Sequence, residues 1–452
     1  MVENIIWCSC NHSRVFAPMS KLFFTESLLL VFGGLILGSN DSVFLPYANE
    51  VLLQIEDPTL CPPICFLPFL LSSSSFLTLV TALGYGVIAQ FVSPLQIFQS
   101  ALLLFSLGCV VCAISGLFCL LAIAQMIKAL ALGLLSLSVP LFVLDQSNWP
   151  QRLAFVHLFS NLGILLPTIA FFVGEAGNPS LWTLIIWSTQ IFFALVLLAN
   201  SAFAQKPSVR RPFLPALFRM DHAWATSCAV SVQLLTQTVC SPQVTVFLCE
   251  MFSTLGLRNP WAYQSVQVFL VFASSLVAVI TVRIVAHKDV LIFCMAAVTV
   301  AYFALGITFS FSSTVQNSMA VSFSIAVHAL LSCLFPIISS TSWIYSTSLL
   351  SPDIMVGGMS ITMASRWLVD ASMAFAFPFF LRNPKSVSFF VLGTICFLST
   401  IVFSRFPNVE KDGEIMEEYD QNQFMAKEFQ LGSKPRFFGP NTEGGNFGET
   451  KR

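Results

Sequence analysis

Charged side chains are scarce in this sequence, since only 10% of its 452 residues are Asp, Glu, Lys or Arg. Soluble globular proteins contain about a quarter of such residues, so this composition excludes a soluble fold. The net charge of −1 also leaves no basic excess with which to bind nucleic acid. We therefore expect no nucleic-acid partner.

Motifs for catalysis and for cofactor binding are lacking as well. The sequence contains no P-loop, no nucleophile elbow and no His/Cys metal cluster, and its five histidines are dispersed. Most of the 13 cysteines lie inside apolar runs, where Cys behaves as a small apolar residue. We expect neither an enzyme nor a metal or other cofactor.

Long apolar runs dominate the sequence, and 56% of the residues are hydrophobic. A helix needs about 20 apolar residues to cross a bilayer, and only helices or closed barrels satisfy every backbone group there. These runs are too long and too continuous for barrel strands. About twelve membrane-spanning helices are predicted, at residues 22–46, 66–92, 95–115, 117–144, 153–173, 181–203, 223–249, 261–285, 289–310, 318–349, 354–381 and 386–405.

Basic residues between the runs predict the orientation and the division of the chain. They gather on the side that holds both termini, which places both termini in the cytosol, and the plasma membrane is the expected location. The longest inner link separates two groups of six spans. The predicted organisation is a cytosolic segment (1–21), a six-helix bundle (22–203), a linker (204–222), a second six-helix bundle (223–406) and a disordered cytosolic tail (407–452).

Two charged residues, Arg366 and Asp370, interrupt the eleventh apolar run. Charge is costly at membrane depth, so such residues usually face a cavity or a partner. Four residues apart on a helix, they lie on one face. They therefore form either an intrahelical ion pair or a cavity-facing pair that binds hydroxyls or selects a charged ligand.

Sequence motifs in the fourth, seventh, tenth and eleventh spans resemble those of sugar porters of the major facilitator superfamily. In the stretch SWIYSTSLLSPDIMVGGMSITMASRWLVDA, Trp343, Tyr345, Gly358 and Trp367 match the family pattern. The stretches SVPLFVLDQSNWPQR and TQTVCSPQVTVFLCEMFSTLGL are similar to two further family motifs. The resemblance implies an all-α membrane protein with the major facilitator fold, in which two six-helix bundles enclose a substrate near the bilayer midplane.

The resemblance also implies a binding site. Its candidate residues are Ser160, Gln237, Trp343, Arg366, Trp367 and Asp370. Asp145 and Arg152 fall where the family has an inner-gate charge network. Aromatic faces suit sugars because the CH-rich ring of a sugar stacks on them. The two Trp residues can instead serve bundle packing, and Gln237 can form an interhelical hydrogen bond.

The function implied is facilitated transport of a hexose or related polyol by alternating access. Besides this small-molecule substrate, membrane lipid is the only expected partner. Asn40 stands where proton-coupled members have Asp, so we do not expect proton coupling, although the adjacent Asp41 keeps it open. Two alternatives remain. Arg366 can select an anionic or zwitterionic metabolite, and the loss of the family's inner-loop charges fits a non-transporting sugar receptor. Lys128, in the fourth span, is a cavity residue, a snorkelling residue or a partner of another span.

Overall fold

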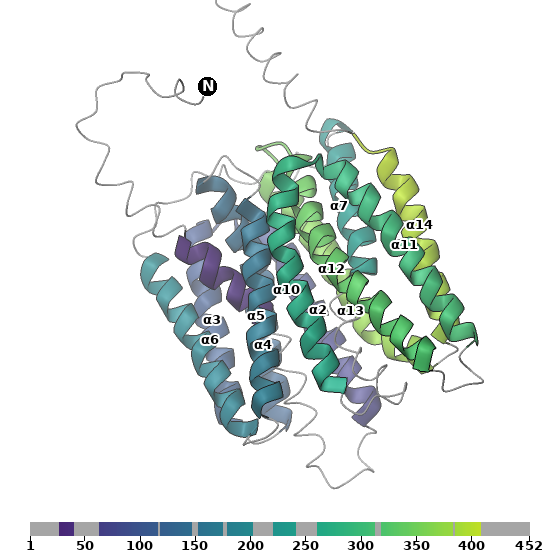
Figure 1. The fold of residues 1–452 in the computed structure, drawn as a ribbon. Helices are drawn as coiled ribbons and strands as arrows, with labels where there is room; N and C mark the ends of the chain where they lie inside the picture. Colours follow the sequence, from purple (N-terminus) through teal and green to yellow (C-terminus); the bar gives the residue numbers. More distant parts are fainter. Residues whose placement is uncertain are drawn as a thin grey trace, which may run out of the picture. The chain divides into compact units, whose positions relative to one another are not determined.

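The structure is a computed structural model that describes residues 27–39, 63–115, 118–146, 152–174, 179–201, 220–240, 260–311, 318–382 and 385–407. The described residues form helices. A short helix, Ser27–Ser39, comes first. It is followed by α2 (Pro63–Ile88), α3 (Pro94–Ile114), α4 (Phe118–Gln146), α5 (Leu153–Gly174), α6 (Pro179–Ser201), α7 (Met220–Val239), α10 (Pro260–Ile284), α11 (His287–Phe311), α12 (Ser318–Ser348), α13 (Met355–Arg382) and α14 (Lys385–Ser404) (Figure 1).

The helices confirm the all-helical membrane fold expected from the apolar runs. Within the described ranges, nine helices are long and apolar enough to span a membrane. Their outward faces expose large apolar side chains such as Phe293, Val300 and Ile114, which water would disfavour and lipid accommodates. Of the predicted first span, only Ser27–Ser39 is described.

Helix α3 begins at a neutral capping box. The Ser93 hydroxyl accepts a hydrogen bond from the Gln96 backbone, and the Gln96 side chain accepts one from the Ser93 backbone. Pro94 follows at the first helical position, where its missing N–H costs nothing. Uncharged residues therefore form the turn between α2 and α3.

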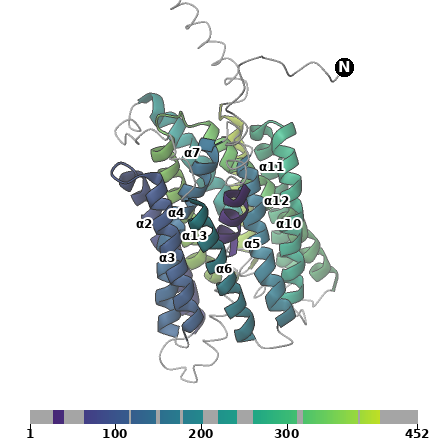
Figure 2. The same cartoon turned by 90° about the vertical axis from the view of Figure 1, so that its left-hand side faces the viewer.

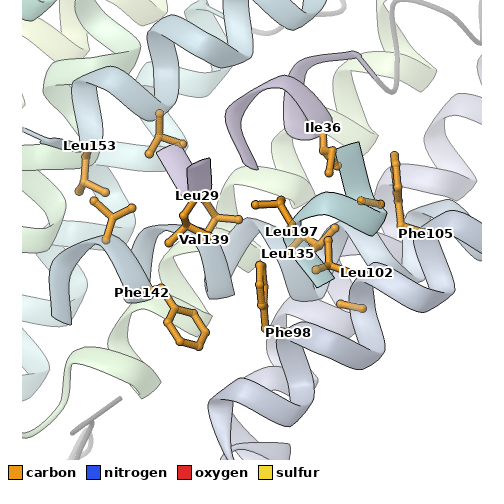
Figure 3. Packing of buried hydrophobic residues seen from close by; sticks show 14 of the residues in the cluster. Leu29, Ile36, Phe98, Leu102, Phe105, Leu135, Val139, Phe142, Leu153 and Leu197 are labelled. Carbon is orange, nitrogen blue, oxygen red and sulfur yellow. The ribbon is translucent and has the colours of Figure 1, made fainter. Parts of the chain in front are cut away.

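An apolar cluster holds the first half of the chain together (Figure 3). It combines the short helix with α3, α4, α5 and α6 through Leu29, Ile36, Phe98, Leu102, Phe105, Leu135, Val139, Phe142, Leu153 and Leu197. Gly34 and Gly38 let the short helix approach the backbone of α5 closely, and a Cβ at Gly38 would overlap the Ser160 carbonyl. Small residues spaced four apart are a common means of close helix contact in membranes.

The second half of the chain packs through α7, α10, α11, α12, α13 and α14. Aromatic rings fill the contact between α11 and α14, where Phe309 and Phe389 stack with ring centroids 5.2 Å apart. The Tyr302 hydroxyl of α11 donates a hydrogen bond to the carbonyl of Val239, the last residue of α7. A buried Tyr usually finds such a partner, because an unpaired hydroxyl is costly away from water.

Proline and hydroxyl side chains modify α12. Pro336 has no N–H with which to bond the Ser332 carbonyl one turn earlier. That carbonyl instead accepts a hydrogen bond of 3.4 Å from Ser274 of α10. The hydroxyls of Thr341 and Ser342 bond back to carbonyls of their own helix. The α12 backbone thus lacks one regular hydrogen bond at Pro336, and side-chain hydroxyls bond several of its nearby carbonyls.

The two halves meet along α2 with α13 and along α5 with α10 (Figures 1 and 2). A second apolar cluster crosses this boundary at the end where α2 finishes and α3 begins. That end is the one predicted to face the cytosol. The cluster joins Tyr85, Leu141, Ala229, Trp343, Leu350, Ile354, Met359 and Met363, from both halves. In this structure the halves are therefore packed together at the predicted cytosolic end.

Candidate functional site

Trp343 of α12 lies between the two halves of the chain. The imidazole of His157, on α5, meets the indole edge-on with ring centroids 4.6 Å apart. The guanidinium carbon of Arg366, on α13, lies 5.4 Å from the Trp343 ring centroid, which is within cation–π range. One aromatic side chain therefore links the first half, through α5, to two helices of the second half.

Three buried polar atoms near this junction have no hydrogen-bond partner among the described residues. They are Nε1 of Trp343, Nε2 of His157 and Oε1 of Gln233. The Gln233 amide nitrogen, on α7, donates to the Ser346 hydroxyl one turn along α12 from Trp343, at 3.2 Å. Buried polar atoms are rarely left unpaired in native proteins, so these atoms are candidate contacts for a bound solute.

Trp367 and Asp370 connect α13 to the first half at different places. The Trp367 indole donates a long hydrogen bond of 3.4 Å to the Ser136 hydroxyl on α4. The Asp370 carboxylate, which is only 1% exposed, accepts a hydrogen bond of 3.0 Å from Ser75 on α2. Arg366 and Asp370 lie one turn apart and are close enough to interact electrostatically. Asp370 thus links the two halves through Ser75 and also interacts electrostatically with Arg366.

The other predicted binding residues lie nearby but make no described contact with Trp343. Gln237 is buried one turn along α7 from Gln233. Ser160 is half-buried on α5, one turn beyond His157, where its backbone meets the glycines of the short helix. The structure therefore brings Trp343, Arg366 and Trp367 together at the boundary and leaves Ser160 and Gln237 at its margin.

Parts of the predicted gate and coupling site fall outside the described residues. Asp145 lies in the last turn of α4, but its side chain is not described. Arg152 immediately precedes α5 and is half-buried. Asn40 and Asp41 lie outside the described ranges. The inner-gate network of Asp145 and Arg152 remains a prediction.

His157 and Gln233 are site residues that the sequence reasoning missed. Each is a polar side chain inside an apolar run, FVHLFS and SVQLLT, and both are buried. Polar residues inside membrane spans are usually functional, and that signal was available for both. Their contacts with Trp343 and Ser346 required the three-dimensional packing of α5, α7 and α12.

The arrangement is suited to binding rather than to bond-making chemistry. Indole faces offer flat apolar surface, and imidazole, guanidinium and amide groups offer donors and acceptors around it. No cluster of three or more potential metal ligands occurs in the described residues. A small solute with an apolar face and a polar rim would satisfy the groups that are present.

Comparisons with known proteins agree with the fold. Residues 201–422 match the sequence model of the family described as sugar (and other) transporter. A solved structure of a major facilitator superfamily proton:xylose symporter, XylE, bound to 6-bromo-6-deoxy-D-glucose aligns with a TM-score of 0.72 at 15% identity, covering 87% of this chain and 99% of that one. A search of curated protein sequences gives no match.

Other solved structures share the same architecture. The partially occluded, inward-open xylose transporter XylE from E. coli aligns with a TM-score of 0.67 at 14% identity, covering 86% of this chain and 98% of that one. The human organic anion transporter MFSD10 aligns with a TM-score of 0.60 at 12% identity, covering 85% and 99%. At such identities the likeness shows the fold alone. The chain is a multi-pass membrane protein with the major facilitator fold, and the sugar-porter resemblance is confirmed for residues 201–422.

Proposed function

Because the chain has the major facilitator fold and residues 201–422 match a sugar-transporter family, we propose that it transports a small solute by alternating access. The favoured solute is a hexose or a related polyol, moved by facilitated uniport. In this mechanism the two halves rock about a central site that opens to each side of the membrane in turn. A site for such a carrier must therefore be built from both halves.

The junction at Trp343 is the observation that supports this proposal most directly. His157 comes from the first half, whereas Trp343, Arg366 and Gln233 come from the second. A sugar hydroxyl at the edge of the indole can accept a hydrogen bond from Trp343 Nε1, and another hydroxyl can donate to Gln233 Oε1. Separation of the halves would divide this site and release the solute.

Uniport is proposed because the acid of proton-coupled sugar porters is replaced by Asn40. The structural neighbours include a proton:xylose symporter, so coupling is tested together with transport. An inward proton gradient should leave the initial rate of hexose uptake unchanged. A pH gradient that drives hexose accumulation would contradict uniport and point to coupling.

Arg366 favours a second candidate, a carrier of an anionic or zwitterionic metabolite. A guanidinium held beside an indole presents several N–H donors that match a carboxylate in geometry. His157 contacts the same indole edge-on, and its imidazole ring can donate a further hydrogen bond. Organic acids bearing hydroxyl groups are therefore the competing substrate class.

Counterflow in liposomes distinguishes these candidates. Purified protein is reconstituted, loaded with one unlabelled solute, and assayed for uptake of labelled hexoses, polyols and hydroxy acids. We expect saturable hexose or polyol counterflow that the Trp343→Ala variant weakens. Counterflow confined to acids, and lost in Arg366→Gln, would support the second candidate. Saturable binding with no flux for any solute would instead identify a sugar receptor.

The orientation belongs to the same proposal. The distribution of Arg and Lys between spans favours a cytosolic location for both termini, and the plasma membrane is part of the proposal. A protease-accessible tag added at either terminus should stay protected in intact cells and be cleaved after permeabilisation. Cleavage of a terminal tag in intact cells that carry the protein at their surface would reverse the orientation.

A further inference from the structure

Helix α4 contains two buried polar side chains that the substrate site does not use. Gln125 and Lys128 lie one turn apart and have no exposed surface. Within the described residues, the Lys128 ammonium and both polar atoms of the Gln125 amide have no hydrogen-bond partner. The residues lie two to three turns of α4 away from Ser136, which bonds Trp367. They form a separate polar centre inside the first half.

The surroundings of Lys128 show that its position is built into the packing. The ammonium lies 5.7 Å from the Phe105 ring centroid on α3. A Cβ added at Gly108 would approach Lys128 Cγ to 2.5 Å, so the absence of a side chain there makes room for the lysine stem. Lys128 is therefore held in the bundle interior, and it does not snorkel to the membrane surface.

Neighbouring polar groups are already occupied by one another. The Cys109 thiol of α3 donates to the Gln190 side-chain oxygen on α6, at 3.3 Å. The Gln190 amide nitrogen donates to the hydroxyl and the carbonyl of Ser39, at 2.9 and 3.2 Å. Within the described residues, none of these bonds involves Lys128 or Gln125. The ammonium and the Gln125 NH₂ group are left as donors.

A buried cation with unpaired donors is energetically unfavourable unless a negative charge neutralises it. The Gln125 oxygen could accept one ammonium proton, yet further N–H groups of both side chains would remain. A cluster with surplus donors and one positive charge matches a ligand that only accepts hydrogen bonds and has one negative charge.

We propose that Lys128 and Gln125 bind a single small monovalent anion, with chloride as the expected occupant. The ammonium supplies the charge, and the Gln125 NH₂ group supplies a second donor. Full burial of both side chains restricts the site to a monatomic or similarly small ion. The anion joins α4 to the Phe105 and Cys109 surface of α3, and it stabilises the first half whether or not solute is bound.

Thermal unfolding of the purified full-length protein tests the proposal. Chloride is titrated against gluconate at constant ionic strength, with no solute present. The unfolding midpoint should rise on the order of 2 °C for each tenfold increase in chloride above its dissociation constant. Bromide should replace chloride, and sulfate should not. Lys128→Met should abolish the dependence of the midpoint on chloride. Lys288→Met should keep it, because Lys288, at the start of α11, instead donates a hydrogen bond to the Phe406 carbonyl.

Equal unfolding midpoints in chloride and gluconate would overturn the proposal, and so would a chloride effect that persists in Lys128→Met. If Lys128→Met does not fold, the wild-type titration is read together with crystals soaked in bromide. An anomalous peak beside the Lys128 nitrogen supports the site, and its absence in bromide-soaked crystals overturns it. These outcomes do not depend on flux, so the anion site and the proposed transport can fail separately.

Discussion

Trp343 contacts His157 and Arg366, which come from different halves, and these contacts make it the most informative single residue. Trp343→Ala removes the stacking surface and the cation–π contact with Arg366. The stacking surface contributes about 1.5–3 kcal/mol to solute binding, so solute affinity should fall by roughly 10- to 100-fold. Loss of the cation–π contact lowers the stability of the protein itself. Trp343→Phe keeps a ring but loses the N–H, so its solute affinity should lie between those of the wild type and Trp343→Ala. Equilibrium binding of solute to each purified protein measures the three affinities. Equal affinities would contradict a site at the indole.

Ser75 links the two halves through a single hydrogen bond. Its hydroxyl donates to the buried Asp370 carboxylate, and bonds to charged groups contribute about 1.5–3 kcal/mol. Ser75→Ala should therefore lower the free energy of unfolding by about that amount. The matched control is Ser73→Ala, because the exposed Ser73 hydroxyl bonds only the Phe69 carbonyl of its own helix. Chemical denaturation in detergent compares the two, and equal losses would contradict the inferred role of Asp370.

At the scale of helices, glycine determines how closely the short helix and α5 approach. Gly38→Ala places a methyl group on the Ser160 carbonyl of α5, and backbone cannot move aside as a side chain can. We expect a loss of at least 2–3 kcal/mol in unfolding free energy, or failure to fold. Gly84→Ala on α2 is the control, since the nearest atom, Ile88 Cδ1, lies 3.9 Å away. This variant should be neutral or gain up to about 1 kcal/mol.

Detergent-stable yield and unfolding midpoints measure both variants. A Gly38→Ala protein as stable as Gly84→Ala would show that the two helices lie further apart than they do in this structure.

The helices themselves were predictable from sequence because membrane insertion requires long apolar runs. The predicted spans at residues 95–115, 153–173 and 318–349 agree closely with α3, α5 and α12. Helix ends were less predictable, since α4 extends to Gln146, two residues past the predicted end of its span. Of the predicted span 223–249, residues beyond 240 lie outside the described ranges. Tertiary contacts such as that between Tyr302 and Val239 are not visible in local composition.

The candidate site was only partly predictable. Trp343 and Arg366 were identified by motif position and by charge in an apolar run. Their contact, however, depends on how α12 and α13 pack. Asp370 was expected to share the role of Arg366, whereas its described hydrogen bond reaches Ser75 across the boundary between halves. His157 lies 186 residues from Trp343 in the chain, so no local pattern indicates their pairing.

At the scale of the whole molecule, closure of the predicted cytosolic end defines one state of the transport cycle. Ser360 of α13 bonds the Ala82 carbonyl and the Gly86 amide of α2 in that region. A Cβ built on Gly86 would lie 3.1 Å from Ser360 Cβ. Disulfides need about 3.5–4.5 Å between these atoms, so a small shift suffices. The Gly86→Cys/Ser360→Cys protein should oxidise readily and lose most of its flux.

Reduction should restore that flux, and each single variant should transport with or without oxidant. Uptake in liposomes under oxidising and reducing conditions measures the effect. A fully cross-linked protein that still transports would show that α2 and α13 stay together throughout the cycle.

The bonding pattern around Pro336 determines how α12 responds to force. A regular helix resists bending because its hydrogen bonds act in series along the axis. In α12 the Ser332 carbonyl bonds Ser274 of the neighbouring helix, and the hydroxyls that follow compete for further carbonyls. Its stiffness is therefore lowest near the residues that precede Trp343. When the halves move apart, α12 should bend in this region. The segment before Pro336 would then stay packed on α10 while Trp343 tilts.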